Sequence, residues 1–427
     1  MRYDTVILDL DGTITESAPG IMRSAAYALE KMGRPVPGED VLRRFVGPPL
    51  VDSFIRYCGL TEAEAMEAIE IYRERHTVLG WKEARVYTGI APMLIALKRA
   101  GAYIALASSK PLPLCKETLA YFGLLPLFDR LSAPPYSATK ADKEQLILDA
   151  LPARFEHACM IGDRRFDMDG ARRSGVTAIG AGYGYGSEEE LLVSGAQVYC
   201  PDVASLADHL LEGLPRMPGF FLSLEGSDGC GKSTQAALLR QFLEDAGYPV
   251  TYSREPGGCP ISERIRDIIL DVRSEGMSDE CEALLYAASR AQHVHEVILP
   301  ALRRGDVMLC DRFVDSSIAY QGVGRGLGDW VWEINRRAAE NNMPNLTLFF
   351  DLNPDEAIRR RLNAAAADRL ESEGDRFMRV VYDAFIGICE KHPDRIVRVD
   401  ASGNIEQIRD RVRQIVVNRL TAVAKAV

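Results

Sequence analysis

Short apolar runs that alternate with amphipathic stretches are the feature that most restricts how this chain can fold. The runs lie at residues 5–10, 102–108, 158–163 and 176–181 in the first half and at 220–226, 307–312 and 346–352 in the second. Continuous apolar runs of this length, separated by helix-like segments, are typical of buried strands in a parallel sheet. The sequence therefore predicts an α/β fold, in which the loops at the carboxyl ends of the strands carry the chemistry.

A linker-like stretch separates the two halves. Residues 211–219 read LEGLPRMPG and place prolines and glycines directly before a new apolar run. At 427 residues the chain is about two to three times the length of a usual single domain. We therefore expect two three-layer α/β domains with parallel sheets, one over residues 1–215 and one over residues 216–427.

Composition narrows the classes of partner. Hydrophobic residues make up 47% and charged residues 26%, as in ordinary globular proteins. The formal net charge of -10 argues against broad nucleic-acid binding, which needs a basic surface. We find no signal-peptide pattern and no apolar run of membrane-spanning length, so we expect no membrane partner and a cytoplasmic location. The cysteines form no C-x-x-C pair, which predicts neither a zinc site nor a disulfide framework.

The strongest single motif follows the apolar run at 220–226. Residues 226–233 read GSDGCGKS and fit the phosphate-loop pattern G-x-x-x-x-G-K-[ST], with a helix-like stretch after it. In such a loop the backbone N–H groups turn toward phosphates, Lys232 places a positive charge at the β and γ phosphates, and the Ser233 hydroxyl can ligate Mg²⁺. The expected nucleotide-binding residues are Gly226, Ser227, Asp228, Gly229, Cys230, Gly231, Lys232, Ser233 and Thr234.

A phosphate loop alone leaves GTPases, ATPases and nucleotide kinases open. Three further segments follow it in order: SREPGG at 253–258, LLYAASRAQH at 284–293 and LCDRFVDSSIAYQG at 309–322. Together with the loop they resemble thymidylate kinase over about two hundred residues. The resemblance implies ATP-dependent phosphorylation of dTMP to dTDP, with Mg²⁺ as cofactor, in a homodimer.

The same resemblance implies a role for each matching residue. Asp311 would lie near Mg²⁺, and Arg312 would bind the dTMP phosphate, which suits a bidentate guanidinium. Tyr286 would stack on thymine, Arg290 would donate to a base carbonyl, and Asp228 would approach the sugar 3′-hydroxyl. The remaining expected contacts in the acceptor pocket are Ser317, Tyr320, Gln321, Arg254 and Glu255.

Phosphoryl transfer also calls for a cationic lid over the ATP phosphates. The candidate is residues 359–369, within AIRRRLNAAAADRLESEGDRF. This segment resembles the lid of thymidylate kinases that carry a catalytic arginine there and a glycine, here Gly229, in the phosphate loop. Arg369 is the expected catalytic residue. For residues 359–361 the alternative is a solvated helix face, which is the usual role of a basic run.

The first half carries a second motif at the end of its first apolar run. Asp9 and Asp11 stand two residues apart in DLDGT, where both carboxylates can face a phosphate. This group resembles the haloacid dehalogenase-type phosphatases. The resemblance implies Asp9 as nucleophile, Asp11 as acid and base on the leaving oxygen, and Mg²⁺ between them.

The other pieces of that family pattern follow in order. Ser108 would hydrogen-bond the phosphate, and Lys143 would neutralise the nucleophile, with Lys140 as the alternative. Asp163, at the end of the run 158–163, would be a Mg²⁺ ligand, with Asp167 as its supporting carboxylate. Residues of about 15–82 are largely helix-like and would form a helical cap over a small phosphomonoester.

Alternatives remain open for both halves. The first half resembles the phosphoglycolate phosphatase and 5′-nucleotidase-like branch, and the sequence leaves its substrate open between nucleoside monophosphates and other esters. It could instead be a non-catalytic module that regulates or assembles the kinase. The kinase half could act on another monophosphate such as dUMP or AMP. His293 and His295 stand two apart on a helix, and we interpret both as packing or surface residues.

Overall fold

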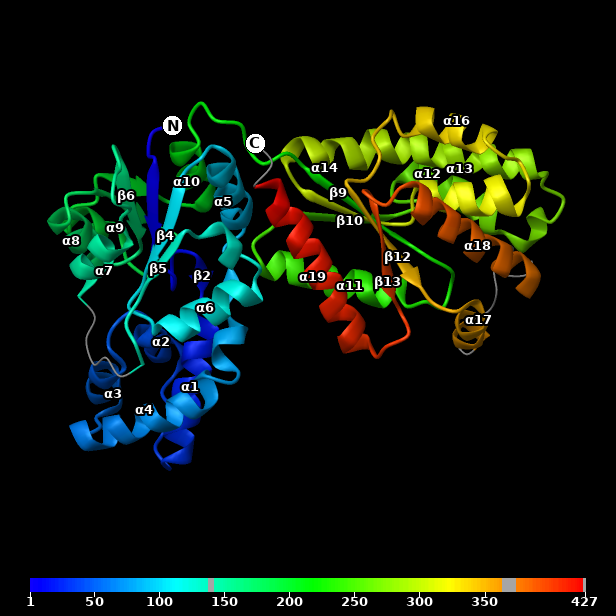
Figure 1. Cartoon of the computed structure of the whole chain (residues 1–427). Helices are drawn as coiled ribbons and strands as arrows, with labels where there is room; N and C mark the ends of the chain where they lie inside the picture. The colour runs from blue at the N-terminus through cyan, green and yellow to red at the C-terminus, as the bar shows by residue number, and fades with distance from the viewer. Residues whose placement is uncertain (137–141, 363–373, 425–427) are drawn as a thin grey trace. The chain divides into compact units, whose positions relative to one another are not determined.

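The computed structural model describes residues 1–136, 142–362 and 374–424, and the chain divides into two compact units. Unit 1 is built mainly from Met1–Met217, and unit 2 mainly from Pro218–Glu244 and Pro249–Leu420. In each unit helices surround a central sheet (Figure 1). The predicted fold class, α/β with parallel sheets, is confirmed.

Unit 1 contains a sheet of parallel strands in the order β5-β4-β1-β6-β7-β8. Each apolar run expected in this half forms a central strand. The strands are β1 Thr5–Leu8, β4 Tyr103–Ala107, β5 Arg130–Ser132, β6 Ala158–Gly162, β7 Thr177–Ala181 and β8 Val198–Cys200.

Both faces of this sheet are buried. On β1, Ile7 packs into a cluster with Ile147 of α7 and Met168 of α8, while Val6 and Leu8 point to the opposite face and are also buried. Since successive strand residues alternate in direction, an uninterrupted apolar run indicates helices on both sides. The helices around the sheet are α5 Ile90–Arg99, α6 Leu112–Tyr121, α7 Lys143–Ala150, α8 Arg165–Arg173, α9 Glu188–Val193 and α10 Val203–Leu210.

A helical cap is inserted between β1 and β4, and it has its own core around Phe45, Phe54 and Tyr72. Its helices are α1 Ala18–Lys31, α2 Glu39–Leu42, α3 Leu50–Cys58 and α4 Glu62–His76. Helix α4 begins with a capping box in which Thr61 and Glu64 satisfy each other's backbone N–H groups. A short antiparallel ribbon of β2 (Thr15–Glu16) and β3 (Arg85–Val86) joins the cap to the rest of unit 1.

Unit 2 contains a second parallel sheet, in the order β10-β11-β9-β12-β13. Its strands are β9 Phe220–Glu225, β10 Val250–Arg254, β11 Val307–Asp311, β12 Leu346–Asp351 and β13 Ile396–Asp400. Every residue of β9 is buried, which matches its place at the centre of the sheet. The adjacent carboxyl ends of β9, β10 and β11 therefore bring together loops that are far apart in the sequence.

Helices cover both faces of this sheet as well. Arg413 of α19 stacks on Phe242 of α11, so these two helices are neighbours on one face. On the other face Ile298 and Ala301 pack against Phe221 and Met308. The helices are α11 Lys232–Asp245, α12 Pro260–Leu270, α13 Asp279–His293, α14 Leu299–Arg304, α15 Val314–Ser317, α16 Trp330–Ala338, α17 Pro354–Leu362, α18 Asp375–Lys391 and α19 Ile405–Val423, with π-helical turns at Val294–Ile298 and Ile318–Gly324.

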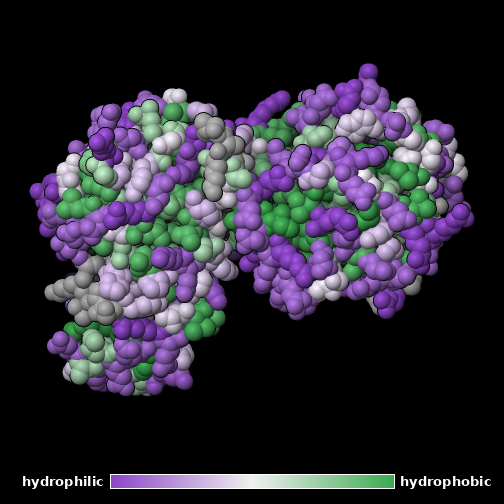
Figure 2. Space-filling model, viewed as in Figure 1, coloured by the Kyte–Doolittle hydropathy of each residue, from purple (hydrophilic) through white to green (hydrophobic). Residues whose placement is uncertain are grey.

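Hydrophilic side chains predominate on the viewed face of both units, with smaller hydrophobic areas among them (Figure 2). Within the described residues, no helix combines the length and apolarity that crossing a bilayer would need. All nine cysteines are free thiols.

Candidate active sites

Two adjacent cavities lie at the carboxyl ends of β9, β10 and β11 in unit 2. One, here called the aromatic cavity, is lined among others by Tyr286, Phe313 and Tyr320. The other, here called the loop cavity, is lined by the glycine-rich loop after β9 and by Asp311. Both cavities share Asp228, Glu255, Arg266 and Arg312. The shared side chains mark the place where a group bound in one cavity would meet a group bound in the other.

The glycine-rich loop connects β9 to α11. Gly226, Gly229 and Gly231 have φ angles of 143°, 86° and 90°, and residues with a Cβ rarely adopt such positive values. The buried Lys232 Nζ donates to the carbonyl oxygens of Gly226 at 2.9 Å and Ser227 at 3.0 Å, which holds the ammonium against the loop. Gly229, Gly231, Lys232, Ser233 and Thr234 face the loop cavity.

The loop cavity also offers oxygen ligands for a cation. The Ser233 hydroxyl donates to Asp311 Oδ2 at 3.4 Å. The other carboxylate oxygen, Asp311 Oδ1, is buried and has no hydrogen-bond partner among the described residues. A buried carboxylate oxygen without a donor is costly unless a ligand satisfies it, and Mg²⁺ prefers such oxygens. This donor set fits a magnesium ion.

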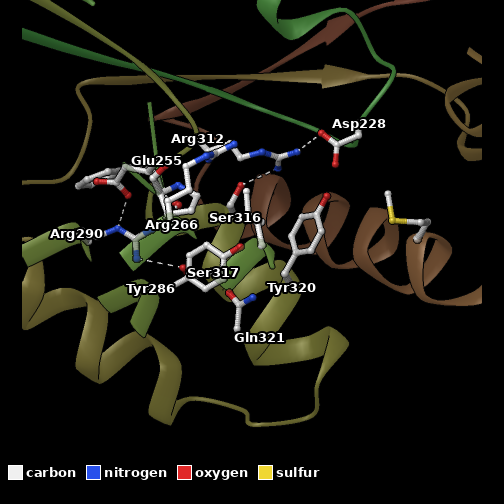
Figure 3. A pocket seen from close by; sticks show the side chains of 14 residues that line it. Asp228, Glu255, Arg266, Tyr286, Arg290, Arg312, Ser316, Ser317, Tyr320 and Gln321 are labelled. Atoms are coloured by element: carbon white, nitrogen blue, oxygen red, sulfur yellow. Dashed lines mark hydrogen bonds and ion pairs between the residues drawn. The ribbon is translucent and has the colours of Figure 1, made fainter. Parts of the chain in front are cut away.

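Arg312 lines both cavities, and its guanidinium points toward Asp228 and Ser316 (Figure 3). Its φ angle of 70° is left-handed, which is uncommon for a residue with a side chain. Its Nη2 donates to Asp228 Oδ1 at 2.6 Å and its Nη1 to Ser316 Oγ at 3.2 Å. The guanidinium carbon also lies 5.4 Å from the centre of the Tyr320 ring.

A buried carboxylate supports this strained backbone. Glu225 accepts from the Phe313 N–H at 2.8 Å and from the Ser316 hydroxyl at 2.5 Å. Burial raises the pKa of Glu225 to about 8, and Asp315 adds to the effect. Glu225 therefore ties the end of β9 to the loop after β11 and fixes Phe313 and Ser316, which follow Arg312 in that loop.

The wall of the aromatic cavity is rigid around Arg290. Its Nε donates to Glu255 Oε2 at 2.7 Å, its Nη1 to Ser317 Oγ at 3.1 Å, and its Nη2 to the Phe313 carbonyl at 3.1 Å. Nη1 also contacts Asn335 Oδ1. Of the five N–H groups of an arginine, these contacts leave one on Nη2 for a ligand, as judged from the described residues.

The other expected acceptor residues divide between the cavities. Gln321, whose Nε2 donates to Glu282 Oε1 at 2.9 Å, lines the aromatic cavity with Tyr286, Ser317 and Tyr320. Arg254 lines only the loop cavity, and it donates to the Pro256 carbonyl at 3.1 Å. Arg266, which the sequence patterns did not indicate, lines both cavities and donates to the same carbonyl at 2.9 Å. A lone arginine on an amphipathic helix carries no sequence signal for such a place.

The expected lid is described only at its beginning. Arg360 lines the loop cavity and pairs with Glu356, while Arg359 is exposed and donates to the Asp355 carbonyl. Arg369 lies outside the described residues.

Unit 1 brings a second set of charged side chains to the carboxyl ends of its strands. Carboxylate oxygens of Asp9, Asp163 and Asp167 all lie within 4.8 Å of one another. Lys143, at the start of α7, donates to Asp9 Oδ1 at 2.9 Å, and its Nζ lies 2.6 Å from Asp167 Oδ1. The alternative, Lys140, lies outside the described residues.

The electrostatics of this cluster favour a bound cation. Burial raises the pKa of Asp9 to about 6, although Lys143 opposes the shift. Burial also raises the pKa of Asp163 well above its usual value, and both Asp167 and Asp9 add to that shift. Clustered hard oxygen ligands that repel one another suit Mg²⁺, so the residues present fit the metal.

Close packing holds Asp163 in place. Its Oδ2 accepts from the Tyr185 N–H at 2.8 Å, and its Oδ1 lies 3.3 Å from Thr13 Oγ1. A Cβ added at Gly12 would lie 2.2 Å from Asp163 Oδ2, and a Cβ added at Gly184 would lie 2.3 Å from the Cβ of Asp163. These two positions accept only glycine, because any side chain would displace the carboxylate.

Asp11 stands apart from the other carboxylates and pairs with a different lysine. The nearly buried Lys110 donates from Nζ to Asp11 Oδ1 at 3.1 Å. Ser108, at the end of β4, accepts from the Lys110 N–H at 3.3 Å and is 2% exposed. Lys110 was missed in the sequence, although it stands only two residues after Ser108.

Two family models match the chain, and they divide it in the same way as the two sites do. Residues 224–412 match the family model described as thymidylate kinase, and residues 6–181 match the one described as haloacid dehalogenase-like hydrolase. A thymidylate kinase from Exiguobacterium sp. is 44% identical over 205 residues, which are 48% of this chain and 97% of the relative. One from Pelobacter propionicus is 44% identical over 216 residues, which are 49% of this chain and 99% of the relative. A solved structure described as a predicted phosphatase from Clostridium acetobutylicum aligns at 38% identity and a TM-score of 0.46, over 50% of this chain and all of its own.

The raised carboxyl pKa values in unit 1 predict that Asp163→Asn stabilises the metal-free chain. When folding raises the pKa of a carboxyl group, the folded chain binds the proton more tightly than the unfolded chain does. The stability of the fold is therefore highest below the unfolded pKa and falls as pH rises through the folded pKa. The ionised Asp163 therefore destabilises the fold at neutral pH, and its neutral isostere removes that penalty. In thermal melts with EDTA we expect the variant to gain stability at about pH 7.5 but not near pH 4.

Added Mg²⁺ should raise the melting temperature of the parent chain at about pH 7.5 by more than that of the Asp163→Asn variant, which keeps only the magnesium site of unit 2. Asp169→Asn, at a partly exposed position on α8, is the matched control and should behave as the parent. An Asp163→Asn chain that melts below the parent in EDTA at about pH 7.5 would contradict the electrostatic account.

Proposed function

The chain belongs to the thymidylate kinase family through its C-terminal part, and from this premise we propose that unit 2 transfers a phosphoryl group from ATP to dTMP, giving dTDP. The position of Arg312 carries the proposal. Its guanidinium lies at the boundary of the aromatic and loop cavities, where the phosphate of an acceptor would meet the phosphates of a donor. Asp228 and Ser316 hold it there before any ligand binds.

The two cavities suit the two nucleotides differently. The loop cavity offers Lys232 and the backbone N–H groups of the glycine-rich loop to the ATP phosphates. Ser233 and Asp311 would hold the magnesium ion, which neutralises charge on the phosphate oxygens. The aromatic cavity offers the Tyr286 ring for stacking on a base, and the Nη2 of Arg290 can reach a base carbonyl.

Transfer itself needs little covalent help from the protein. The dTMP phosphate oxygen attacks the γ phosphorus, a new P–O bond forms, and the bond to the β-phosphate oxygen breaks to release ADP. Arg312 orients the attacking phosphate with two parallel N–H groups once the phosphate competes with Asp228 for the guanidinium. Lys232 and Arg360, which line the loop cavity, would face the charge that develops on the departing side, and the catalytic role expected for Arg369 stays a prediction.

For unit 1 we propose Mg²⁺-dependent hydrolysis of a small phosphomonoester. Asp9 would attack the phosphorus and form an aspartyl phosphate as the bond to the ester oxygen breaks, and Asp11 would give its proton to that oxygen. Asp11 would then take a proton from a water molecule that attacks the aspartyl phosphate, which restores Asp9 and releases inorganic phosphate. Lys143 orients Asp9, and Ser108 can hydrogen-bond the phosphoryl oxygens. The haloacid dehalogenase-like match and the clustered acidic residues support this reading.

Exposed apolar side chains on two helices of unit 2 support the homodimer that the family resemblance implies. Ile261 and Ile268 on α12 and Leu284 on α13 are 43%, 51% and 50% exposed, on two helices that pack together. Exposed apolar side chains of this kind favour a protein contact. We propose a homodimer of a cytoplasmic enzyme.

The acceptor can be tested with a panel of monophosphates. With ATP and Mg²⁺, we expect kcat/KM to be highest for dTMP and lower for dUMP and AMP. Arg312→Lys should lower kcat/KM for dTMP by on the order of a hundredfold, because an ammonium cannot replace the bidentate guanidinium. Arg337→Ala, at a side chain that is 78% exposed, serves as the control. A preference for AMP over dTMP would refute the thymidylate assignment.

Phosphate release tests unit 1 separately. With Mg²⁺ and no ATP, the chain is expected to release inorganic phosphate from at least one ester in a set of nucleoside monophosphates and phosphoglycolate. Asp9→Asn should reduce that rate by about a thousandfold or more, since it removes the nucleophile. Cleavage of phosphoglycolate alone would exclude nucleoside monophosphates as substrates. Unchanged release in Asp9→Asn would instead favour the alternative of a non-catalytic module.

A further inference from the structure

A fully buried histidine lies directly behind the wall of the aromatic cavity. His293 is the last residue of α13 and is 0% exposed. Its Nδ1 lies 2.9 Å from Glu255 Oε1, and its Nε2 lies 2.7 Å from Ser253 Oγ. His293 and His295 look alike in the sequence, but of the two only His295 is exposed. A buried polar side chain with two short contacts does more than fill space.

One of the two contacts of His293 is with Glu255, which lines both cavities. Helix α13 holds this carboxylate from two positions one turn apart. Arg290 binds Oε2 through its Nε at 2.7 Å, and His293 binds Oε1. With one donor on each oxygen, the Glu255 carboxylate has a single orientation.

The orientation of Glu255 fixes that of Arg290 in turn. Arg290 also donates to Ser317 and to the Phe313 carbonyl, so its guanidinium plane is set by Glu255 on one side and by these groups on the other. Its remaining Nη2 N–H, the one available for a base carbonyl, then points in one direction only. Without His293, Glu255 Oε1 would lose its donor, and the Nε of Arg290 would lose its fixed partner, while the contacts of Arg290 with Ser317, Asn335 and Phe313 would remain.

The hydrogen bonds assign a tautomer to His293. A carboxylate only accepts, so Nδ1 carries the hydrogen in its contact with Glu255. Nε2 of the neutral ring is then an acceptor, and the Ser253 hydroxyl must donate to it. This arrangement balances the buried charges, since one carboxylate meets one guanidinium. The surroundings are also closely fitted, because a Cβ at Gly258 would lie 2.3 Å from Ser253 Oγ and 2.7 Å from His293 Nε2.

We propose that His293 is a positioning residue for acceptor binding, acting through the relay Ser253–His293–Glu255–Arg290. It touches neither nucleotide, and its task is to hold Glu255 and thereby the base-facing N–H of Arg290. The inference rests on the proposed kinase function for its kinetic consequence. The relay itself is a property of the folded chain and can be tested without any substrate.

Two substitutions separate positioning from packing. Asparagine places an amide N–H where His293 carries Nδ1, so His293→Asn keeps the hydrogen bond to Glu255. His293→Phe keeps the ring volume but leaves Glu255 Oε1 and Ser253 Oγ without their partner. His295→Asn, the same change at an exposed position two residues away, is the matched control.

The kinetic experiment compares KM for the acceptor that the parent chain phosphorylates best with KM for ATP. We expect His293→Phe to raise the acceptor KM by about tenfold or more, as for loss of a hydrogen bond to a charged group. KM for ATP should change by less than about twofold, and His293→Asn should recover the acceptor KM to within about threefold. Equal losses in the Asn and Phe variants, or a parallel rise in both KM values, would overturn the proposal.

The second readout is the tautomer, measured by NMR on the full-length chain labelled with ¹⁵N-histidine. The chain has six histidines, and the signals lost in His293→Asn identify those of His293. We expect a protonated Nδ1 and an unprotonated Nε2. An Nε2–H tautomer or an imidazolium would overturn the relay even if the kinase were active. An inactive parent chain with the expected tautomer would instead refute the proposed kinase function and leave the relay standing.

A further variant is needed should His293→Phe fail to fold. Ser253→Ala removes the donor to Nε2 and is expected to shift the His293 ¹⁵N signals. Unchanged signals would count against the relay.

Discussion

One buried carboxylate connects the two halves of the kinase site. Glu225 ends β9 and accepts hydrogen bonds from residues just after β11, where Arg312 adopts its left-handed backbone. The parallel sheet makes this possible, because it brings the ends of the two strands side by side. The glycine-rich loop, which begins one residue later, and Arg312 are therefore held by the same side chain. The shared boundary between donor and acceptor cavities follows from this contact.

Unit 1 also places its site residues at the carboxyl ends of parallel strands, but most of the charged groups gathered there are carboxylates. Its strand ends gather carboxylates whose ionisation is costly in the folded chain, as the raised pKa values of Asp9 and Asp163 indicate. Lys143 offsets part of this repulsion, and a divalent cation would offset the rest. Such stored repulsion is typical of functional sites, since a chain selected for stability alone would not retain it.

Much of this organisation could be predicted from the sequence, because local patterns encode it. Continuous apolar runs predicted the central strands of both sheets, and the motifs at the ends of these runs indicated the two groups of site residues. The edge strands β5, β8, β10 and β13 were not singled out, since they are short or mix polar with apolar residues. Glu225, Lys110 and His293 were missed for another reason. Their partners are far away in the sequence, at a separation of 91 residues for Glu225 and Ser316, so only the fold reveals the contact.

The central claim is that the chain moves a phosphoryl group from ATP to dTMP. A ³¹P NMR time course of the full-length chain with ATP, dTMP and Mg²⁺ follows every phosphorus at once and needs no coupling enzyme. The account predicts that the signals of dTDP and ADP grow together, in equal amounts, while those of ATP and dTMP decline. Conversion of ATP to ADP and inorganic phosphate with no dTDP signal would contradict it.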